Sequence, residues 1–308
     1  RFEEIPLLPF TENEKYRFKE GKKSGGASLL KNQSDCPFRA FVLYRLHAHK
    51  SEIPDTDFDP LVRGNLIHLI LELFWKKTQT RDQLEKLYES NQLEIEVKIC
   101  VEEATNVICR SLLDQPEFLK MEKKRNQSLA LEWLINFELV RNDFTVLKPE
   151  KSETAKINGL TLNLKIDRID EISDKKYALI DYKSGEAKTS DWLKERIIAP
   201  QLPLYSTLIT PSVVAFGKIK KGQIEFKGVK DSSIDFLSFK ATNYTKETKV
   251  SEWNDLLQLW KNKIELLANE FLLGRAVIEP SLNQETCKNC DLDSLCRIRE
   301  RDFDNEEE

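Results

Sequence analysis

The chain has 308 residues, 40% of them hydrophobic and 32% charged, which is enough for one large domain or two modest ones. Its 48 Lys and Arg are outnumbered by 52 Asp and Glu, giving a formal charge of −4, so a protein that coats nucleic acid with a uniformly basic surface is excluded. No segment approaches the roughly 18 uninterrupted apolar residues of a membrane span, and no signal peptide is visible, so we expect a cytoplasmic protein without a membrane partner.

The first half of the chain has helical patterns. Because the chain starts at Arg1 rather than Met, we interpret it as part of a longer polypeptide, with residues 1–27 as a lead-in. Residues 28–142 form the predicted helical part, in which Ser28 is a candidate N-cap and Pro37 suits a first helical turn. Apolar residues at helical spacing predict helices over Asp35–Leu46, Leu61–Lys77, Gln83–Leu113 and Glu117–Arg141.

Residues 143–275 have a different pattern, in which β-forming residues dominate. The expected strands are Thr145–Pro149, Thr161–Ile166, Tyr177–Tyr182, Ser212–Lys218 and Gln223–Val229. Helices are expected over Thr189–Arg196, Pro200–Ile209 and Lys246–Leu273, the last ended by Gly274. We therefore predict an α/β (mixed α+β) fold, with a small mixed central sheet flanked by helices and preceded by a helical region. Residues 276–308, the cysteine tail, follow this core and end in acidic residues.

Two carboxylates and a lysine stand near the ends of two predicted neighbouring strands. Asp167 lies near the end of one strand, and Asp181 and Lys183 end the next. Residues i and i+2 of a strand face the same side, so a hairpin would bring all three together as strand-end polar groups outside the core. Carboxylates hold Mg²⁺ while leaving positions open for water and phosphate, and a lysine can stabilise the developing charge. Taken alone, an Asp-x-Lys triplet is more often an ordinary surface ion pair.

The surrounding motifs favour a functional interpretation. IDRID, IDYKSG and QLPLY resemble the RecB-type branch of the PD-(D/E)XK nucleases, whose core is restriction-endonuclease-like. The resemblance implies that Asp167 and Asp181 are ligands of Mg²⁺ or Mn²⁺ and that Lys183 is catalytic. Gln201 and Tyr205 match the family's Gln-x-x-x-Tyr motif and, at i and i+4, share one helix face.

The resemblance extends to an upstream helix. Gly64 and His68 match a Gly-x-x-x-His motif, which implies that His68 is a third metal ligand. A lone histidine on an apolar helix is otherwise more often a core residue. Glu150 and Glu153 compete for the glutamate that often precedes the metal-binding hairpin in this family.

Cysteines form a second cluster of candidate ligands. Cys287, Cys290 and Cys296 are spaced C-x2-C-x5-C, and Cys36 lies far upstream in CPFR. Four such thiols suit either tetrahedral zinc or a [4Fe–4S] cluster, which their spacing alone does not separate. The arrangement resembles that of AddB-type nuclease domains, with one cysteine upstream and three downstream, and this resemblance implies [4Fe–4S], with zinc as the alternative. The remaining two, Cys100 and Cys109, are expected to be buried core residues.

The resemblance implies a Mg²⁺-dependent deoxyribonuclease, an exonuclease acting on single-stranded DNA in recombination and repair. No G-x-x-x-x-G-K-[ST] phosphate loop occurs in the chain, so a helicase would be a missing N-terminal part or a separate partner. The alternatives are a non-catalytic iron–sulfur DNA-binding scaffold with a nuclease fold, and a zinc-containing structural protein. Lys218, Lys220 and Lys221 are candidate phosphate contacts, although each could be an ordinary surface lysine.

Overall fold

The computed structural model describes residues 25–49, 60–109, 115–173, 175–236, 239–282, 284–288 and 290–298. The lead-in up to residue 24 and the acidic C-terminal residues lie outside this range. Among the described residues, no helix has the length and apolar character needed to cross a membrane.

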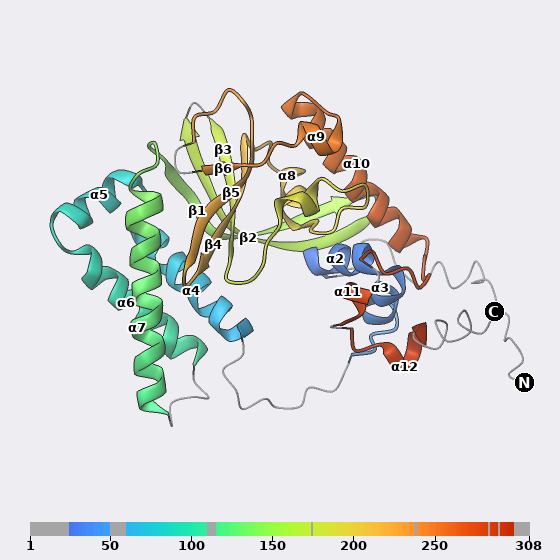
Figure 1. Cartoon of the computed structure of the whole chain (residues 1–308), viewed down its shortest axis with the longest axis horizontal. Helices are drawn as coiled ribbons and strands as arrows, with labels where there is room; N and C mark the ends of the chain where they lie inside the picture. The colour runs from blue at the N-terminus through green and yellow to red at the C-terminus, as the bar shows by residue number, and fades with distance from the viewer. Residues whose placement is uncertain are drawn as a thin grey trace, which may run out of the picture.

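A mixed sheet forms the centre of the described structure (Figure 1). Its strands lie in the order of the sequence, with parallel pairing between β3 and β4 and between β5 and β6, and antiparallel pairing elsewhere. The strands are β1 (Thr145–Ile157), β2 (Leu160–Ser173), β3 (Lys176–Lys183), β4 (Val213–Lys220), β5 (Gln223–Lys230) and β6 (Phe239–Ala241). The predicted small mixed sheet flanked by helices is therefore confirmed.

The first hairpin is longer than the sequence pattern indicated. The expected strands Thr145–Pro149 and Thr161–Ile166 are only parts of β1 and β2, which pair along almost their whole length. Asp167 consequently lies in the middle of β2, and its predicted position near a strand end is wrong.

The two aspartates nevertheless meet, because the sheet forks beside them. The pairing of β2 with β3 runs from Ser173 and Lys176 to Arg168 and Ile180. Asp167 and Asp181 would form the next pair, but from there β3 continues in register with β4, which places Lys183 beside Lys218. The carboxylates thus stand where the backbone pairing of the two strands ends.

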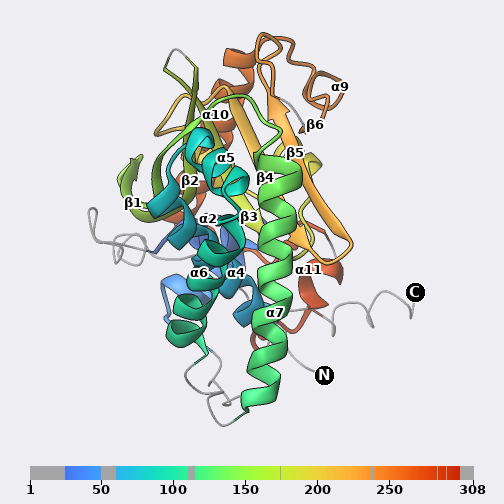
Figure 2. The same ribbon diagram turned by 90° about the vertical axis from the view of Figure 1, so that its left-hand side faces the viewer.

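One face of the sheet is covered by a helical layer, on the left in Figure 1 and facing the viewer in Figure 2. Its buried core includes Trp75, Trp133 and both remaining cysteines, Cys100 and Cys109, as predicted. The layer contains α4 (Pro60–Thr78), α5 (Arg81–Glu89), α6 (Leu93–Ile108), α7 (Pro116–Trp133) and a π-helical turn (Leu134–Glu138).

The opposite face has its own core, built around Trp192, Trp260 and Phe216. It is covered by α2 (Ala27–Asp35), α3 (Pro37–Tyr44), α8 (Gln201–Ser206) and α10 (Trp253–Leu272), on the right in Figure 1. The described part of the cysteine tail contributes two short helices, α11 (Gln284–Lys288) and α12 (Asp293–Cys296).

Several predicted helix boundaries are wrong for local reasons. The expected helix Gln83–Leu113 is two helices, because the chain turns at Asn91, whose φ of 54° is left-handed. Thr189–Arg196 forms only a 3₁₀ turn, η3 (Thr189–Trp192). Lys246–Leu273 is divided into α9 (Thr245–Thr248) and α10, because Lys249 adopts a left-handed conformation. Ser28 lies inside the first turn of α2, whose N-cap is Gly26.

Candidate active site

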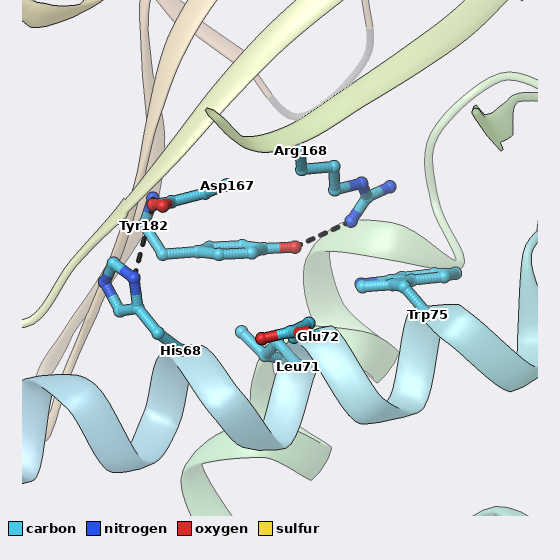
Figure 3. Close-up of a pocket in the computed structure, with 7 residues that line it drawn as sticks. All are labelled: His68, Leu71, Glu72, Trp75, Asp167, Arg168 and Tyr182. Atoms are coloured by element: carbon cyan, nitrogen blue, oxygen red, sulfur yellow. Dashed lines mark hydrogen bonds and ion pairs between the residues drawn. The ribbon is translucent and has the colours of Figure 1, made fainter. Parts of the chain in front are cut away.

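Four residues predicted from the sequence meet at the fork between β2 and β3. Lys183 Nζ lies 2.5 Å from Asp181 Oδ2. His68 Nδ1, from α4, lies 3.3 Å from Asp167 Oδ2, as Figure 3 shows. The backbone N–H of Tyr182 donates a hydrogen bond of 3.0 Å to the same Asp167 oxygen. The site therefore combines side chains from both strands and from the helical layer.

A glycine allows α4 to approach this fork. A Cβ atom at Gly64 would lie 2.9 Å from Ser184 Oγ, closer than side chains normally come. Because Gly64 has none, the helix passes next to the residue that follows Lys183. His68, one turn further along α4, then reaches the aspartates. The close approach at Gly64 and the position of His68 one turn later together give a physical reason for the Gly-x-x-x-His spacing.

Asp181 is buried, with 1% of its surface exposed, so the expectation that it lies outside the core is wrong. Both of its carboxylate oxygens are buried. Oδ2 forms an ion pair with Lys183 Nζ, whereas Oδ1 has no hydrogen-bond partner among the described residues. Burial, together with the charge of Asp167, raises the pKa of Asp181 to about 6 although Lys183 lowers it. A buried carboxylate with one oxygen unpartnered, next to a second carboxylate, suits a hard divalent cation, which would supply further positive charge.

The pKa values of the two neighbouring groups, Asp167 and His68, are shifted toward their charged forms. Burial raises the pKa of Asp167, but the hydrogen bond and charge of His68 and the charge of Lys183 outweigh it and lower that pKa overall. Burial lowers the pKa of His68, but Asp167 and Asp181 outweigh it and raise that pKa above its ordinary value. The site thus favours the charged forms of Asp167 and His68, whereas it disfavours the charged form of Asp181.

Lys183 is further positioned by α8. Its Nζ donates to Gln201 Oε1 over 3.3 Å, and Gln201 Nε2 donates to the Tyr205 hydroxyl over 3.2 Å. The Tyr205 hydroxyl donates in turn to the backbone carbonyl of Lys165 on β2, at 2.6 Å. The structure therefore joins the Gln-x-x-x-Tyr residues to Lys183 in one hydrogen-bonded chain.

A buried charge network behind the site was not anticipated from the sequence. The five guanidinium N–H groups of Arg168 all donate: two to Glu138, two to Asp170 and one to the Tyr182 hydroxyl, at 2.6–3.2 Å. Arg141 also binds Glu138 and Asp170. The charged members are at most 3% exposed. A signal was present in IDRID, since Arg168 and Asp170 are two residues apart in a strand and so share the face opposite Asp167.

Tyr182 connects this network to the site. Its backbone N–H binds Asp167, its hydroxyl accepts from Arg168 at 2.9 Å, and its ring contacts His68 edge to face, with 6.0 Å between centroids. A small cavity of about 10 Å³ lies beside it (Figure 3), room for about one water molecule. Its lining residues are His68, Leu71, Glu72, Trp75, Asp167, Arg168 and Tyr182. Because Tyr182 stands between Asp181 and Lys183, it holds β2 and β3 together where their backbone pairing ends.

The four candidate cluster cysteines are also brought near one another. The tail is attached on both sides of Cys36, since Phe38 N donates to Val277 O and Ser281 N donates to Asp35 O. Burial raises the pKa of Cys287, and nearby Cys290, Cys296 and Cys36 raise it further. In the part of the chain that the structure describes, no three His, Cys, Asp or Glu side chains are arranged to hold a single metal ion as they stand.

The remaining predicted residues are placed as follows. Lys220 and Lys221 are exposed, whereas Lys218 is buried and its Nζ lies 3.5 Å from Glu186 Oε1. Glu153 lies on β1 opposite Leu164. The side chain of Glu150 is outside the described residues.

Comparison with known proteins agrees with this geometry. Residues 27–297 match the PD-(D/E)XK nuclease superfamily. Similar curated proteins are each named as one of the subunits of an ATP-dependent helicase/deoxyribonuclease. That of Clostridioides difficile (strain 630) is 26% identical, covering 58% of this chain and 17% of the relative. That of Thermoanaerobacter sp. (strain X514) is 25% identical, covering 88% and 29%. That of Caldanaerobacter subterraneus subsp. tengcongensis is 31% identical, covering 53% and 15%.

The chain spans less than a third of the length of these relatives. The superfamily match, in contrast, covers most of the chain and includes every residue of the fork site. The chain therefore belongs to the PD-(D/E)XK nuclease superfamily.

Proposed function

We propose that this chain is a metal-dependent DNA nuclease domain, in which His68, Asp167 and Asp181 hold Mg²⁺ or Mn²⁺ and Lys183 is the catalytic lysine. The observation that carries the proposal is the buried carboxylate of Asp181, whose Oδ1 has no hydrogen-bond partner among the described residues and whose Oδ2 is paired with Lys183. A buried carboxylate oxygen that lacks a partner is costly. A divalent cation is the partner that this set of oxygen and imidazole donors fits.

The chain's own residues prepare the site for hydrolysis. When bound, the metal would lower the pKa of a coordinated water and neutralise charge on the phosphate. Asp167, whose pKa is lowered, is ready to bind without first losing a proton. Lys183 is partly exposed and within reach of the fork, so its ammonium can contact a phosphate oxygen and stabilise the charge that develops there. Gln201 and Tyr205 fix its direction.

We propose that Cys36, Cys287, Cys290 and Cys296 bind a [4Fe–4S] cluster, with zinc as the alternative. Support comes from their gathering across more than two hundred residues of sequence and from the rise in the pKa of Cys287 caused by its neighbours. Neighbouring thiolates repel one another, which raises their pKa values. A soft metal centre binds cysteines as thiolates and offsets this repulsion with positive charge. Such a centre would join the tail to the junction of α2 and α3.

We also propose that the substrate is single-stranded DNA, cleaved as an exonuclease in recombination and repair, and that a helicase delivers it. Support for the helicase comes from the names of the relatives, each a subunit of an ATP-dependent helicase/deoxyribonuclease. The single-stranded substrate and the exonuclease mode rest on the resemblance to RecB/AddB-type nucleases.

The test is a cleavage assay on end-labelled single-stranded and duplex DNA with Mg²⁺, with Mn²⁺ and with EDTA. Lys183→Ala should lower cleavage by at least about 100-fold, because it removes the ammonium beside Asp181. Lys261→Ala, at an exposed lysine on α10, is the matched control and should cleave normally. Cleavage by Lys183→Ala at the unsubstituted rate would refute the assignment. Metal-independent DNA binding without cleavage would favour the scaffold instead.

A further inference from the structure

A second, larger cavity of about 640 Å³ opens beside the site. It lies on the α8 side of the sheet, between the segment Glu186–Leu202, the first turns of α2 and Phe216 of β4. Its volume is in the range of about 300–1,000 Å³ that is typical of small-molecule sites. Lys183 and Gln201 form part of its wall, so any occupant would lie next to the proposed catalytic lysine.

The interior of this cavity is apolar and partly aromatic. Trp192, Phe216, Ile198, Leu202 and Ala187 line it, and all are buried. The rings of Trp192 and Phe216 contact each other with centroids 4.5 Å apart. Trp192 is completely buried behind Phe216 and Ile198, so its ring backs the wall without reaching the open space. Such a wall suits a flat, largely apolar group.

The opening, in contrast, is charged. Lys31, Lys183 and Lys188 line it together with Glu186 and Asp191. Both acids already lie near other lysines, Glu186 at 3.5 Å from Lys218 and Asp191 at 3.6 Å from Lys194. Lys31 and Lys183 are themselves paired with Asp35 and Asp181, so Lys188, which is exposed, is the lysine at the opening that is most accessible to an anion.

We propose that this cavity binds the base of an unpaired nucleotide whose phosphate lies at Lys183. A nucleotide matches the apolar interior and the charged opening, because its flat, largely apolar base is joined to a charged phosphate. A base that is paired in a duplex cannot enter, so the cavity would select unpaired DNA. The position of the phosphate rests on the proposed function, whereas base binding by the cavity is testable without any cleavage.

The test compares two probes of equal length and charge, an oligodeoxythymidine and an oligomer of abasic residues, each fluorescently labelled. Anisotropy in EDTA should give a dissociation constant about tenfold lower for the oligodeoxythymidine, the size expected for one base against an aromatic wall. Ala199→Leu projects extra atoms into the cavity lining and should remove this preference. Ala276→Leu, at a similarly half-buried alanine outside the cavity, should keep it. Binding of a blunt duplex should not change in either variant.

Retention of the full preference by Ala199→Leu would overturn the proposal. If that variant does not fold, ultraviolet cross-linking of an iododeoxyuridine oligomer to the unsubstituted protein replaces it. Cross-links at lining residues such as Phe216 or Lys188 would support the cavity, and cross-links confined to other surfaces would overturn it. The two proposals separate cleanly. A protein that prefers bases but does not cleave with Mg²⁺ refutes the nuclease function alone, and one that cleaves but binds both probes equally refutes the cavity alone.

Discussion

Replacing Asp181 with asparagine should stabilise the metal-free domain at neutral pH while abolishing cleavage. The carboxylate is 1% exposed, and its pKa rises from an ordinary 3.8 to about 6. The folded state therefore holds the proton more tightly than the unfolded state does, so stability falls as the pH rises from about 4 through about 6. At about 1.4 kcal/mol per pH unit, ionisation above pH 6 costs the folded state on the order of 3 kcal/mol.

Asparagine keeps the shape of the side chain but has no proton to lose in this range. The free-energy cost of burying its amide is the same at every pH. The pH dependence of the stability difference between the two proteins therefore measures the cost of the Asp181 charge alone. From the same linkage relation, the stability difference between Asp181→Asn and the unsubstituted chain should grow by about 1.5 kcal/mol between about pH 5 and about pH 7.5.

The assay is urea unfolding in EDTA at both pH values, followed by circular dichroism. Millimolar Mg²⁺ should then raise the midpoint of the unsubstituted chain and leave that of Asp181→Asn unchanged, because ligand binding stabilises only a folded state that binds it. If both proteins lost stability in parallel between the two pH values, the buried carboxylate would not carry the raised pKa, and the reasoning would fail.

Three further outcomes follow from the site and the cysteines. Tyr182→Phe leaves one N–H of buried Arg168 without an acceptor and should destabilise the domain by about 1–3 kcal/mol. It should also raise the Mg²⁺ concentration that gives the half-maximal rate. An unchanged concentration would contradict the role of Tyr182. Mg²⁺ affinity, measured by calorimetry, should fall as the pH drops below the raised pKa of His68 and fall more steeply below the pKa of Asp181, about 6, because the metal must displace a proton from each ligand. A profile that does not steepen below about pH 6 would argue against Asp181 as a ligand. Cys36→Ser should remove iron and sulfide and lower thermal stability, whereas Cys100→Ser, in the core of α6, should retain the metal; full iron in Cys36→Ser would exclude it as a ligand.

The sequence was most informative where chemistry requires a fixed spacing. The pairs Gly64–His68, Asp181–Lys183 and Gln201–Tyr205 each lie on one helix or strand, so their spacing alone placed both members on one face. Their convergence from three separate elements is a tertiary property, and it was expected from the family resemblance rather than from periodicity.

Other features of the fold could not be read from local pattern. The long β1–β2 hairpin was underestimated because Glu150–Lys156 is mostly polar and lacks the apolar alternation of a half-buried strand. Helix ends were misplaced where a left-handed residue, such as Asn91 or Lys249, breaks a continuous helical pattern. The network around Arg168 was missed because charged residues in a strand are usually solvated, and only the structure shows Glu138 and Arg141 packed against them.

The site is assembled where the two helical layers of the molecule meet at the forked sheet. His68 belongs to the layer of α4 to α7, whereas Gln201 and the wall of the larger cavity belong to the layer of α2, α8 and α10. Local opening of either layer would separate these residues while the other layer stayed intact. Enzymatic activity would then disappear at a lower denaturant concentration than global circular dichroism reports, and amide hydrogen exchange of α4 and α8 would show which half opens first.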